Sequence, residues 1–166
     1  MIAEQIIVMG VSGCGKSTVG QALAKRLSYP FYDGDDFHPK KNIEKMQQGT
    51  PLTDTDRQGW LETLNKVLLS ESNGVVLACS ALKTDYRQRL IRHLERPLFV
   101  YLKGDFDEIW VRHKNRKNHY FQGRAMLQSQ FDTLIEPVGN NVITVSVTLS
   151  VKEIVEKICQ VLQSKN

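Results

Sequence analysis

The segment from Gly10 to Ser17 constrains this chain more than any other. Its residues, GVSGCGKS, match the phosphate-binding pattern G-x-x-x-x-G-K-[ST] at every fixed position. The pattern is informative when it joins a strand to a helix, and both are expected here. Residues 4–9 end in a short apolar run, and 17–27 carries Val19, Leu23 and Leu27 at helical spacing. The segment therefore predicts a cradle for the phosphates of a nucleoside triphosphate.

Each part of this P-loop has an expected task. Glycines let successive backbone N–H groups turn inward around a phosphate, and the start of the helix adds its positive end. Lys16 can reach the β- and γ-phosphates, and the Ser17 hydroxyl is placed to bind Mg²⁺. Cys14 occupies a variable position where the backbone does the binding, so we expect its thiol to be incidental. The predicted ATP contacts are Gly10, Val11, Ser12, Gly13, Cys14, Gly15, Lys16, Ser17 and Thr18.

The remainder of the chain alternates strands with helices. This alternation predicts an α/β fold, with a mostly parallel sheet covered on both faces and a single domain over residues 1–166. Ser150 is the expected N-cap of the final helix. Further strands are expected at 31–32, 74–79, 98–102 and 142–147, and further helices at 39–48, 54–70, 84–95, 105–114, 124–134 and 151–163.

Amino-acid composition indicates the compartment in which the protein is expected. The chain is 41% hydrophobic and 24% charged, and no apolar run approaches the length of a membrane span. The N-terminal segment has no signal-peptide pattern, which favours the cytoplasm. Cys14, Cys79 and Cys159 are scattered and odd in number, so we expect reduced thiols and no metal site of cysteines.

An acidic loop follows the strand expected at 31–32. Asp33, Asp35 and Asp36 stand within four positions, where their charges repel. A solvated loop is the plain explanation, and a metal ion or a substrate hydroxyl that needs a base is the functional one. Residues i and i+2 at the end of a strand point the same way, so Asp33 and Asp35 are expected to face one site. Asp36 is expected to cap a helix or to be solvated.

Other nucleotide-hydrolysing classes fit less well. A GTPase would carry N-K-x-D, and neither Asn65-Lys66 nor residues 115–118 (NRKN) match it. An ATPase motor or switch would more often end an apolar strand in aspartate, whereas GVVLAC (74–79) continues into Ser80. The acidic loop is then the expected partner of the metal, with Asp33 as its ligand.

Four blocks beyond the P-loop give the chain a family resemblance. They are DGDDFHPKKNIEKMQQGTPLTDTDRQGWL, CSALKTDYR, YLKGDFD and LQSQFDTLIEP. With them the chain resembles the gluconate kinase (gluconokinase) family of small P-loop kinases from about residue 6 to residue 137. Shikimate kinases share the P-loop followed by D-x-D, but not the HPKKNIEKM or CSALK blocks.

The resemblance implies transfer of the ATP γ-phosphoryl group to the 6-hydroxyl of D-gluconate. It also implies a three-layer P-loop kinase fold with a five-stranded sheet, a mobile lid at about 112–125, ATP and Mg²⁺ as cofactors, and a homodimer. One departure is Asn118, where the family pattern has a glycine before the lid histidine. Asparagine tolerates left-handed backbone geometry better than most residues do.

Gluconate is a linear carboxylate with many hydroxyls, so its pocket needs a cationic clamp and hydrogen-bonding groups. Asp35 is the expected base for the accepting hydroxyl. Arg57 is favoured by the resemblance and by its fork geometry, whereas Arg87 stands in a run of arginines of which most are solvated. The predicted substrate contacts are Asp35, His38, Arg57, Lys83, Arg87 and His119.

The cluster of basic residues in the lid has three interpretations. It could be a solvated face, a nucleic-acid patch, or an arm that meets an anionic small molecule. Few aromatic residues surround it, which counts against a nucleic-acid patch, although composition alone does not choose. With the gluconokinase resemblance, we expect a small-molecule substrate and no nucleic-acid partner. Arg112 and Arg116 share a helical face, and both are predicted to contact ATP, with Arg116 catalytic. The cluster comprises Arg112, His113, Lys114, Arg116, Lys117 and His119.

Two classes of function remain at this stage. The first is a sugar-acid kinase, with shikimate or a nucleoside as the alternative acceptor. The second is a nucleotide-binding regulatory protein without turnover. Retention of Lys16, Ser17, Asp33 and Asp35 favours the kinase. Gln130 and Glu136 belong to the resembling blocks, but their chemistry alone does not single them out.

Overall fold

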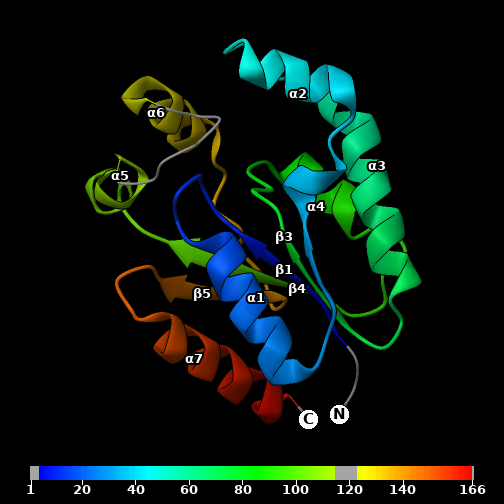
Figure 1. Ribbon diagram of the computed structural model, residues 1–166. Helices are drawn as coiled ribbons and strands as arrows, with labels where there is room; N and C mark the ends of the chain where they lie inside the picture. Colours follow the sequence, from blue (N-terminus) through cyan, green and yellow to red (C-terminus); the bar gives the residue numbers. More distant parts are fainter. Residues whose placement is uncertain (1–3, 115–122, 166) are drawn as a thin grey trace.

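Five parallel strands form the centre of the protein. The computed structural model describes residues 4–114 and 123–165. The strands are β1 (Gln5–Met9), β2 (Phe31–Asp33), β3 (Val75–Ala78), β4 (Pro97–Lys103) and β5 (Val142–Ser146). Their order across the sheet is β2-β3-β1-β4-β5 (Figure 1). The predicted α/β fold with a five-stranded parallel sheet is confirmed.

Helices cover both faces of this sheet, which gives three layers. Helices α1 and α7 lie on one face, and α3 and α4 lie on the other (Figure 1). Helices α2, α5 and α6 stand beyond the carboxyl ends of the strands, and a short 3₁₀ turn, η1, follows β2. The bounds are α1 (Lys16–Leu27), η1 (Gly34–Phe37), α2 (Lys40–Gln47), α3 (Asp54–Ser70), α4 (Thr84–Leu90), α5 (Phe106–Lys114), α6 (Arg124–Thr133) and α7 (Val151–Ser164).

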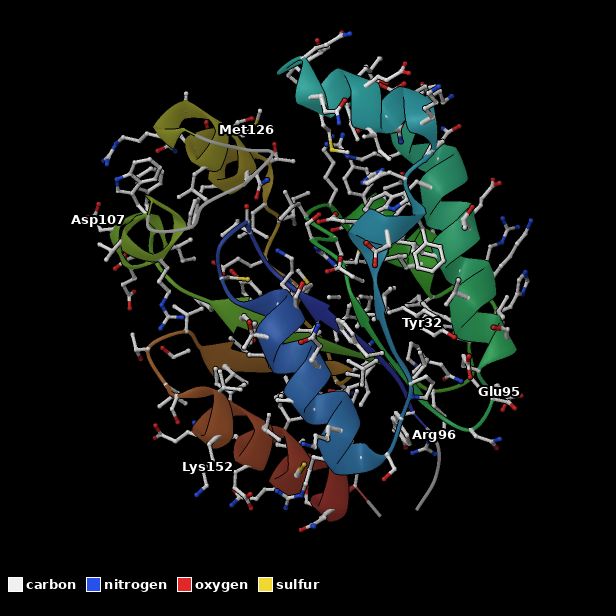
Figure 2. All side chains as sticks on the ribbon, viewed as in Figure 1. Tyr32, Glu95, Arg96, Asp107, Met126 and Lys152 are labelled. Carbon is white, nitrogen blue, oxygen red and sulfur yellow. The ribbon has the colours of Figure 1, made fainter. Side chains whose placement is uncertain are left out.

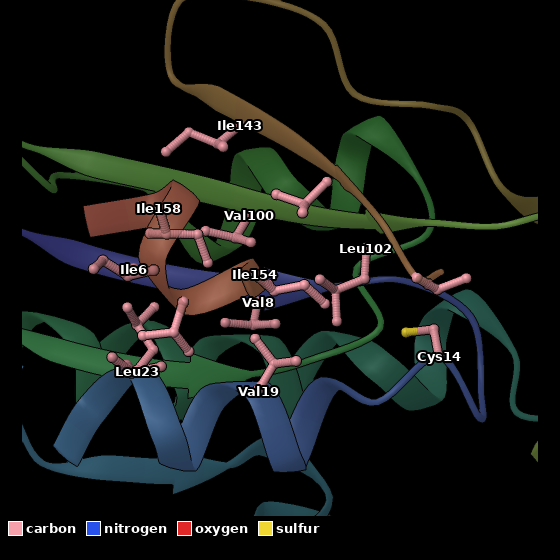
Figure 3. Close-up of a cluster of buried hydrophobic side chains, with 14 of the residues drawn as sticks. Ile6, Val8, Cys14, Val19, Leu23, Val100, Leu102, Ile143, Ile154 and Ile158 are labelled. Atoms are coloured by element: carbon pink, nitrogen blue, oxygen red, sulfur yellow. The ribbon is translucent and has the colours of Figure 1, made fainter. Parts of the chain in front are cut away.

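Strand β1 is buried on both faces because it lies in the middle of the sheet. Its Ile6 and Val8 pack toward α1 and α7, where they join Leu23 and Ile158 (Figure 3). Its Ile7 belongs to the second core, under α3 and α4. Full burial of one such side chain is worth about 1.5–3 kcal/mol. The continuous apolar run before the P-loop is therefore what fixes the loop to the middle of the sheet.

Side-chain capping explains where two of the helices begin. Thr53 and Asp56 form a capping box at the start of α3, and Ser150 forms one with Glu153 at the start of α7, as predicted for Ser150. Helix α4 ends at Leu90, five residues before its predicted end. The Asn65 side chain donates hydrogen bonds to the carbonyls of Leu90 and Arg92, at 2.8 and 2.9 Å, and so satisfies the backbone where the helix stops.

The structure also describes the cysteines and tests for membrane-spanning helices. Cys14, Cys79 and Cys159 are all free and buried. Burial raises the pKa of the Cys79 thiol to about 12, so this thiol is not a reactive thiolate near neutral pH. Within residues 4–114 and 123–165, no helix combines the length and the apolar character that crossing a bilayer requires.

Candidate active site

Two adjoining cavities lie beyond the carboxyl ends of the strands. The P-loop cavity is lined by the loop itself together with Asp33, Asp35, Ser80 and Gln130. The α3–α6 cavity is lined from α3 by Arg57 and Trp60, and from α6 by Met126, which is labelled in Figure 2. Asp35, Ser80 and Gln130 line both cavities. Open parallel sheets bind their ligands at the carboxyl ends of the strands. In this protein the two cavities meet at that edge of the sheet.

The P-loop has the backbone that its glycines permit. Gly10, Gly13 and Gly15 have φ values of 149°, 84° and 98°, in a region that residues with side chains rarely adopt. A Cβ atom on Gly10 would lie 2.7 Å from the Cys14 Sγ atom, which leaves no room for one. The Lys16 ammonium donates to the Val11 carbonyl at 3.0 Å and so lies across the loop. The loop is thus shaped by its own residues.

Asp33 joins the P-loop to the acidic loop. The Ser17 hydroxyl donates to Asp33 Oδ2 at 2.7 Å, and the other carboxylate oxygen accepts from the Asp35 N–H at 3.0 Å. A hydroxyl and a carboxylate so close together are a donor set suited to Mg²⁺, which prefers oxygen ligands and retains several waters. Among the residues that the structure describes, no cluster of three or more His, Cys, Asp or Glu side chains forms an all-protein metal site.

The acidic loop differs from a continued strand, which corrects the reasoning behind its prediction. Strand β2 ends at Asp33, and η1 begins at Gly34. Asp35 therefore lines the same cavity as Asp33 because the chain turns there, and not because of strand alternation. A Cβ atom at Gly34 would lie 2.8 Å from the Ala78 carbonyl oxygen, so the turn requires glycine. Asp33, rather than Asp36, caps this turn, and Asp36 is exposed.

Asp35 has the environment of a base at a junction. Desolvation raises the pKa of its carboxyl, the negative charge of Asp33 raises it further, and the positive charge of Lys16 lowers it. The side chain is nevertheless 77% exposed, so a ligand can reach it. A carboxylate with a raised pKa takes up a proton more readily, as general base catalysis requires.

His38 is a neutral hydrogen-bonding group in this structure. Its ring stacks on Trp60 with centroids 4.2 Å apart, and only 5% of its side chain is exposed. Burial, followed by the nearby charge of Arg57, lowers the pKa of His38 to about 4. Its Nδ1 atom lies 3.3 Å from the amide nitrogen of Asn42, which fixes the ring. His38 therefore lines the α3–α6 cavity without adding a positive charge at neutral pH.

Arg57 and Lys83 have different surroundings, although both were predicted to bind substrate. Arg57 lines the α3–α6 cavity and donates to the Leu52 carbonyl at 2.7 Å and to the Tyr86 hydroxyl at 3.3 Å. Lys83 is paired with Asp54 at 3.1 Å. The Tyr86 ring lies 5.4 Å from each cation, and its hydroxyl donates to Asp54. Among the described residues, Arg57 is thus the cation that lines the cavity, while Lys83 is held by an acid.

Arg87 is buried, which corrects the solvated alternative of its prediction. It is 6% exposed and lies outside the described lining of both cavities. Its guanidinium donates to the carbonyls of Ala81 and Ile135, each at 2.8 Å. These bonds hold the loop after β3 against the segment after α6. The forked donors of Arg87 match backbone carbonyls here, so the solvated alternative is wrong, and the substrate contact stays a prediction.

The predicted lid residues are only partly described. Arg112 donates to the Val147 carbonyl, which links α5 to the loop after β5. Arg116 and His119 lie outside the described residues, as do Asn118 and most of the predicted lid.

Several residues of the site were missed from the sequence. Gln130 accepts a hydrogen bond from the Ser12 N–H at 2.6 Å, although 118 positions separate the two residues. Trp60 was expected only as an apolar core residue, yet it also stacks on His38. Glu136, by contrast, pairs with Lys103 at 3.0 Å and lies outside the described lining of both cavities. Membership of the LQSQFDTLIEP block was the only signal for Gln130, because an isolated glutamine has no distinctive pattern.

Comparison with known proteins identifies the family. The sequence model of a family described as Shikimate kinase matches residues 12–163. A probable gluconokinase of Mus musculus is 45% identical over 95% of this chain and 97% of its own length. The thermoresistant gluconokinase of Escherichia coli (strain K12) is 48% identical over 79% of this chain and 76% of its own length. The chain belongs to the gluconokinase family.

A solved structure supports this membership. A gluconokinase from Sinorhizobium meliloti 1021 has a TM-score of 0.86 and 37% identity, and the match covers 99% of this chain and 98% of that one. The gluconokinase family is thus matched in sequence and in fold over nearly the whole chain, within the broader group that the shikimate kinase model describes.

Proposed function

We propose that this protein transfers the γ-phosphoryl group of ATP to the 6-hydroxyl of D-gluconate and so forms 6-phospho-D-gluconate. The observation that carries the proposal is the position of Asp35, which lines both the P-loop cavity and the α3–α6 cavity. A base at that junction can meet an accepting hydroxyl from one cavity and a phosphoryl group from the other. The acceptor follows from the names of the relatives, which are gluconokinases.

The P-loop side of the site would hold the nucleotide. Its inward N–H groups would bind the phosphates, over the span of Gly10 to Thr18, and Lys16 would offset the charge that develops on the transferred group. Ser17 and Asp33 would hold Mg²⁺, with Asp33 acting through bound water. The ion would supply charge neutralisation and alignment of the β- and γ-phosphates. The 2.7 Å contact between these two side chains supports the assignment.

On the acceptor side, Asp35 would orient the 6-hydroxyl and take its proton. As that oxygen bonds to the γ-phosphorus, the bond from phosphorus to the β,γ-bridging oxygen breaks and ADP leaves. The raised pKa of Asp35 favours proton uptake. Phosphoryl transfer requires little covalent chemistry from the protein, so alignment of the two substrates at this junction is the main contribution.

The carboxylate of gluconate would bind to Arg57. It is the cation that lines the α3–α6 cavity within the part of the chain that the structure describes, and its guanidinium is held in place by Leu52 and Tyr86. His38 would donate or accept a hydrogen bond to a substrate hydroxyl as a neutral ring. Lys83 would reach the substrate only by leaving Asp54. Roles for Arg112 and Arg116 at the nucleotide and for His119 at the substrate remain predictions, and Arg112 would have to release the Val147 carbonyl.

A coupled assay of ADP release tests the proposal. We expect turnover with D-gluconate, and only background with shikimate, with a nucleoside or without acceptor. Preferred turnover of shikimate would establish the alternative kinase. ATP binding without turnover on any acceptor would establish a nucleotide-binding regulatory protein. A magnesium titration with Asp33→Asn tests the metal assignment, and we expect that variant to need more Mg²⁺ for half-maximal turnover.

The compartment, oligomeric state and partners of the protein are also proposals. The family resemblance favours a cytoplasmic homodimer that has no nucleic-acid or membrane partner. Three buried free thiols are compatible with a reducing compartment. Sedimentation at several protein concentrations would determine the oligomeric state, and fractionation of cells would determine the compartment.

A further inference from the structure

Gln130 lies where the two cavities meet. Its carbonyl oxygen accepts the Ser12 N–H at 2.6 Å, and the residue lines both the P-loop cavity and the α3–α6 cavity. Ser12 is a P-loop residue that is only 8% exposed. A side-chain oxygen thus satisfies a backbone donor of the loop whose N–H groups turn toward phosphate. Helix α6 supplies this oxygen, and the same helix also lines the α3–α6 cavity.

The backbone of α6 around Gln130 is firmly held. Leu127, one turn earlier, is fully buried in the core. The Leu134 N–H donates to the Gln130 carbonyl at 2.9 Å, and the Ile135 N–H donates to the Leu82 carbonyl at 2.8 Å. The Ile135 carbonyl in turn accepts from Arg87. A change at Gln130 would therefore be a rotation of its side chain, because the backbone on both sides is anchored.

We propose that Gln130 is a positioning residue that couples nucleotide binding to gluconate binding. This inference rests on the proposed function. Before nucleotide binds, the carboxamide holds the Ser12 N–H. When a phosphate oxygen takes that N–H, the carboxamide is released and turns toward the hydroxyls of the acceptor in the α3–α6 cavity. Each ligand thereby favours the other, because a carboxamide that has turned toward the acceptor leaves the Ser12 N–H free for phosphate.

The test compares gluconate binding with and without a non-hydrolysable ATP analogue and Mg²⁺, by isothermal titration calorimetry. For the unmodified protein we expect the analogue to lower the Kd of gluconate by roughly fivefold or more, a typical size for coupling between sites. Gln130→Met keeps the length of the side chain but removes the oxygen that accepts from Ser12. In this variant we expect the Kd values of gluconate with and without the analogue to agree within about twofold.

The matched control is Gln128→Met, on the same helix. Gln128 is exposed and bonds to Asp132 across the helix surface at 2.9 Å, away from both cavities. We expect it to retain the coupling of the unmodified protein. Gln130→Glu supplies a second variant, in which the carboxylate still accepts from Ser12 but repels phosphate. We expect it to weaken binding of the analogue more than binding of gluconate alone.

The outcomes separate this inference from the proposed function. Turnover of gluconate by the unmodified protein, together with unchanged coupling in Gln130→Met, would overturn the role of Gln130 and leave the kinase assignment intact. Absence of gluconate turnover in the unmodified protein would instead overturn the proposed function. Equal loss of coupling in Gln130→Met and Gln128→Met would also contradict the inference, because it would reflect a general effect on α6.

Discussion

The P-loop cavity and the α3–α6 cavity are built in opposite ways. The first takes more of its lining from one continuous stretch, residues 12–17, than from any other segment, and the glycine conformations and helix start of that stretch are local properties. The second is assembled from η1, the segment from α2 into α3, the loop after β3, and α6. A motif can reveal a site of the first kind, whereas a site of the second kind exists only after the chain has folded.

The two cavities also differ in how their charges are arranged. In the P-loop cavity Lys16 faces Asp33 and Asp35, so a cation and an anionic ligand can be accommodated together. In the α3–α6 cavity Arg57 stands beside neutral His38 and the apolar Trp60. The first arrangement suits a polyphosphate with its metal, and the second suits a ligand with one carboxylate. Substitutions in each cavity should therefore have separable effects.

Asp35→Asn should have the largest effect, because this residue belongs to both cavities. The amide keeps the shape of the side chain but cannot take the proton, so we expect kcat to fall by about 10²–10⁴-fold. Affinity for the nucleotide with Mg²⁺ should barely change. Steady-state kinetics and nucleotide titration measure the two quantities. An active variant, or one that has lost only ATP binding, would show that the junction is not the site of the base.

Lys16→Ala tests the P-loop cavity alone. Removal of one charge that stabilises the transition state should lower kcat by about 10²–10³-fold. Lys16 donates a hydrogen bond to a carbonyl of its own loop, so the thermal unfolding midpoint should stay close to that of the unmodified protein. Gluconate binding measured without nucleotide should also be unchanged. Turnover near the original level would mean that the cradle does not hold the transferred group.

His38 makes the α3–α6 region sensitive to acid. Its pKa is lowered from an ordinary value near 6.5 to about 4, so the folded state binds this proton less readily than the unfolded state does. Stability is therefore full above about pH 6.5 and is lost as the pH falls toward 4, by about 3 kcal/mol in total. Urea unfolding from pH 7 to pH 4 measures this slope. His38→Asn should reduce it, and an identical slope would contradict the assignment.

Arg57→Gln tests the α3–α6 cavity alone. A charge-assisted hydrogen bond to a carboxylate is worth about 1.5–3 kcal/mol, which corresponds to about 10- to 100-fold in gluconate affinity. ATP affinity should change far less, since Arg57 does not line the P-loop cavity. Lys83→Gln is the comparison, and we expect a smaller loss because Asp54 already holds that lysine. If both variants bind gluconate as tightly as the unmodified protein does, the carboxylate of gluconate is bound elsewhere.

The smallest effect is expected at the opposite end of the sheet. Arg96, labelled in Figure 2 far from Met126, pairs with Glu4 at 2.9 Å. An ion pair that remains in contact with water contributes about 0.2–1 kcal/mol. Glu4→Gln should therefore lower the free energy of unfolding by no more than that and leave both KM values unchanged. A change in either KM would show that the two cavities respond to the sheet as a whole.

Much of the fold could be predicted because its signals are local and repeated. The apolar strands of 4–9 and 74–79 and the Ser150 cap all appear where they were expected. The end of α4 was predicted too late because the residue that satisfies its last carbonyls, Asn65, comes from α3. The chain cannot show such a partner before the two helices are packed together.

The same division holds for the site. Gly10, Lys16 and Ser17 were placed by the sequence alone, because glycine geometry and the spacing of a charge within one turn need no distant partner. The tertiary structure decided that Arg87 is a buried tie, that His38 is neutral, and that Gln130 reaches Ser12. A polar side chain acquires its role from what surrounds it, and desolvation and hydrogen-bond partners arise only when distant segments meet.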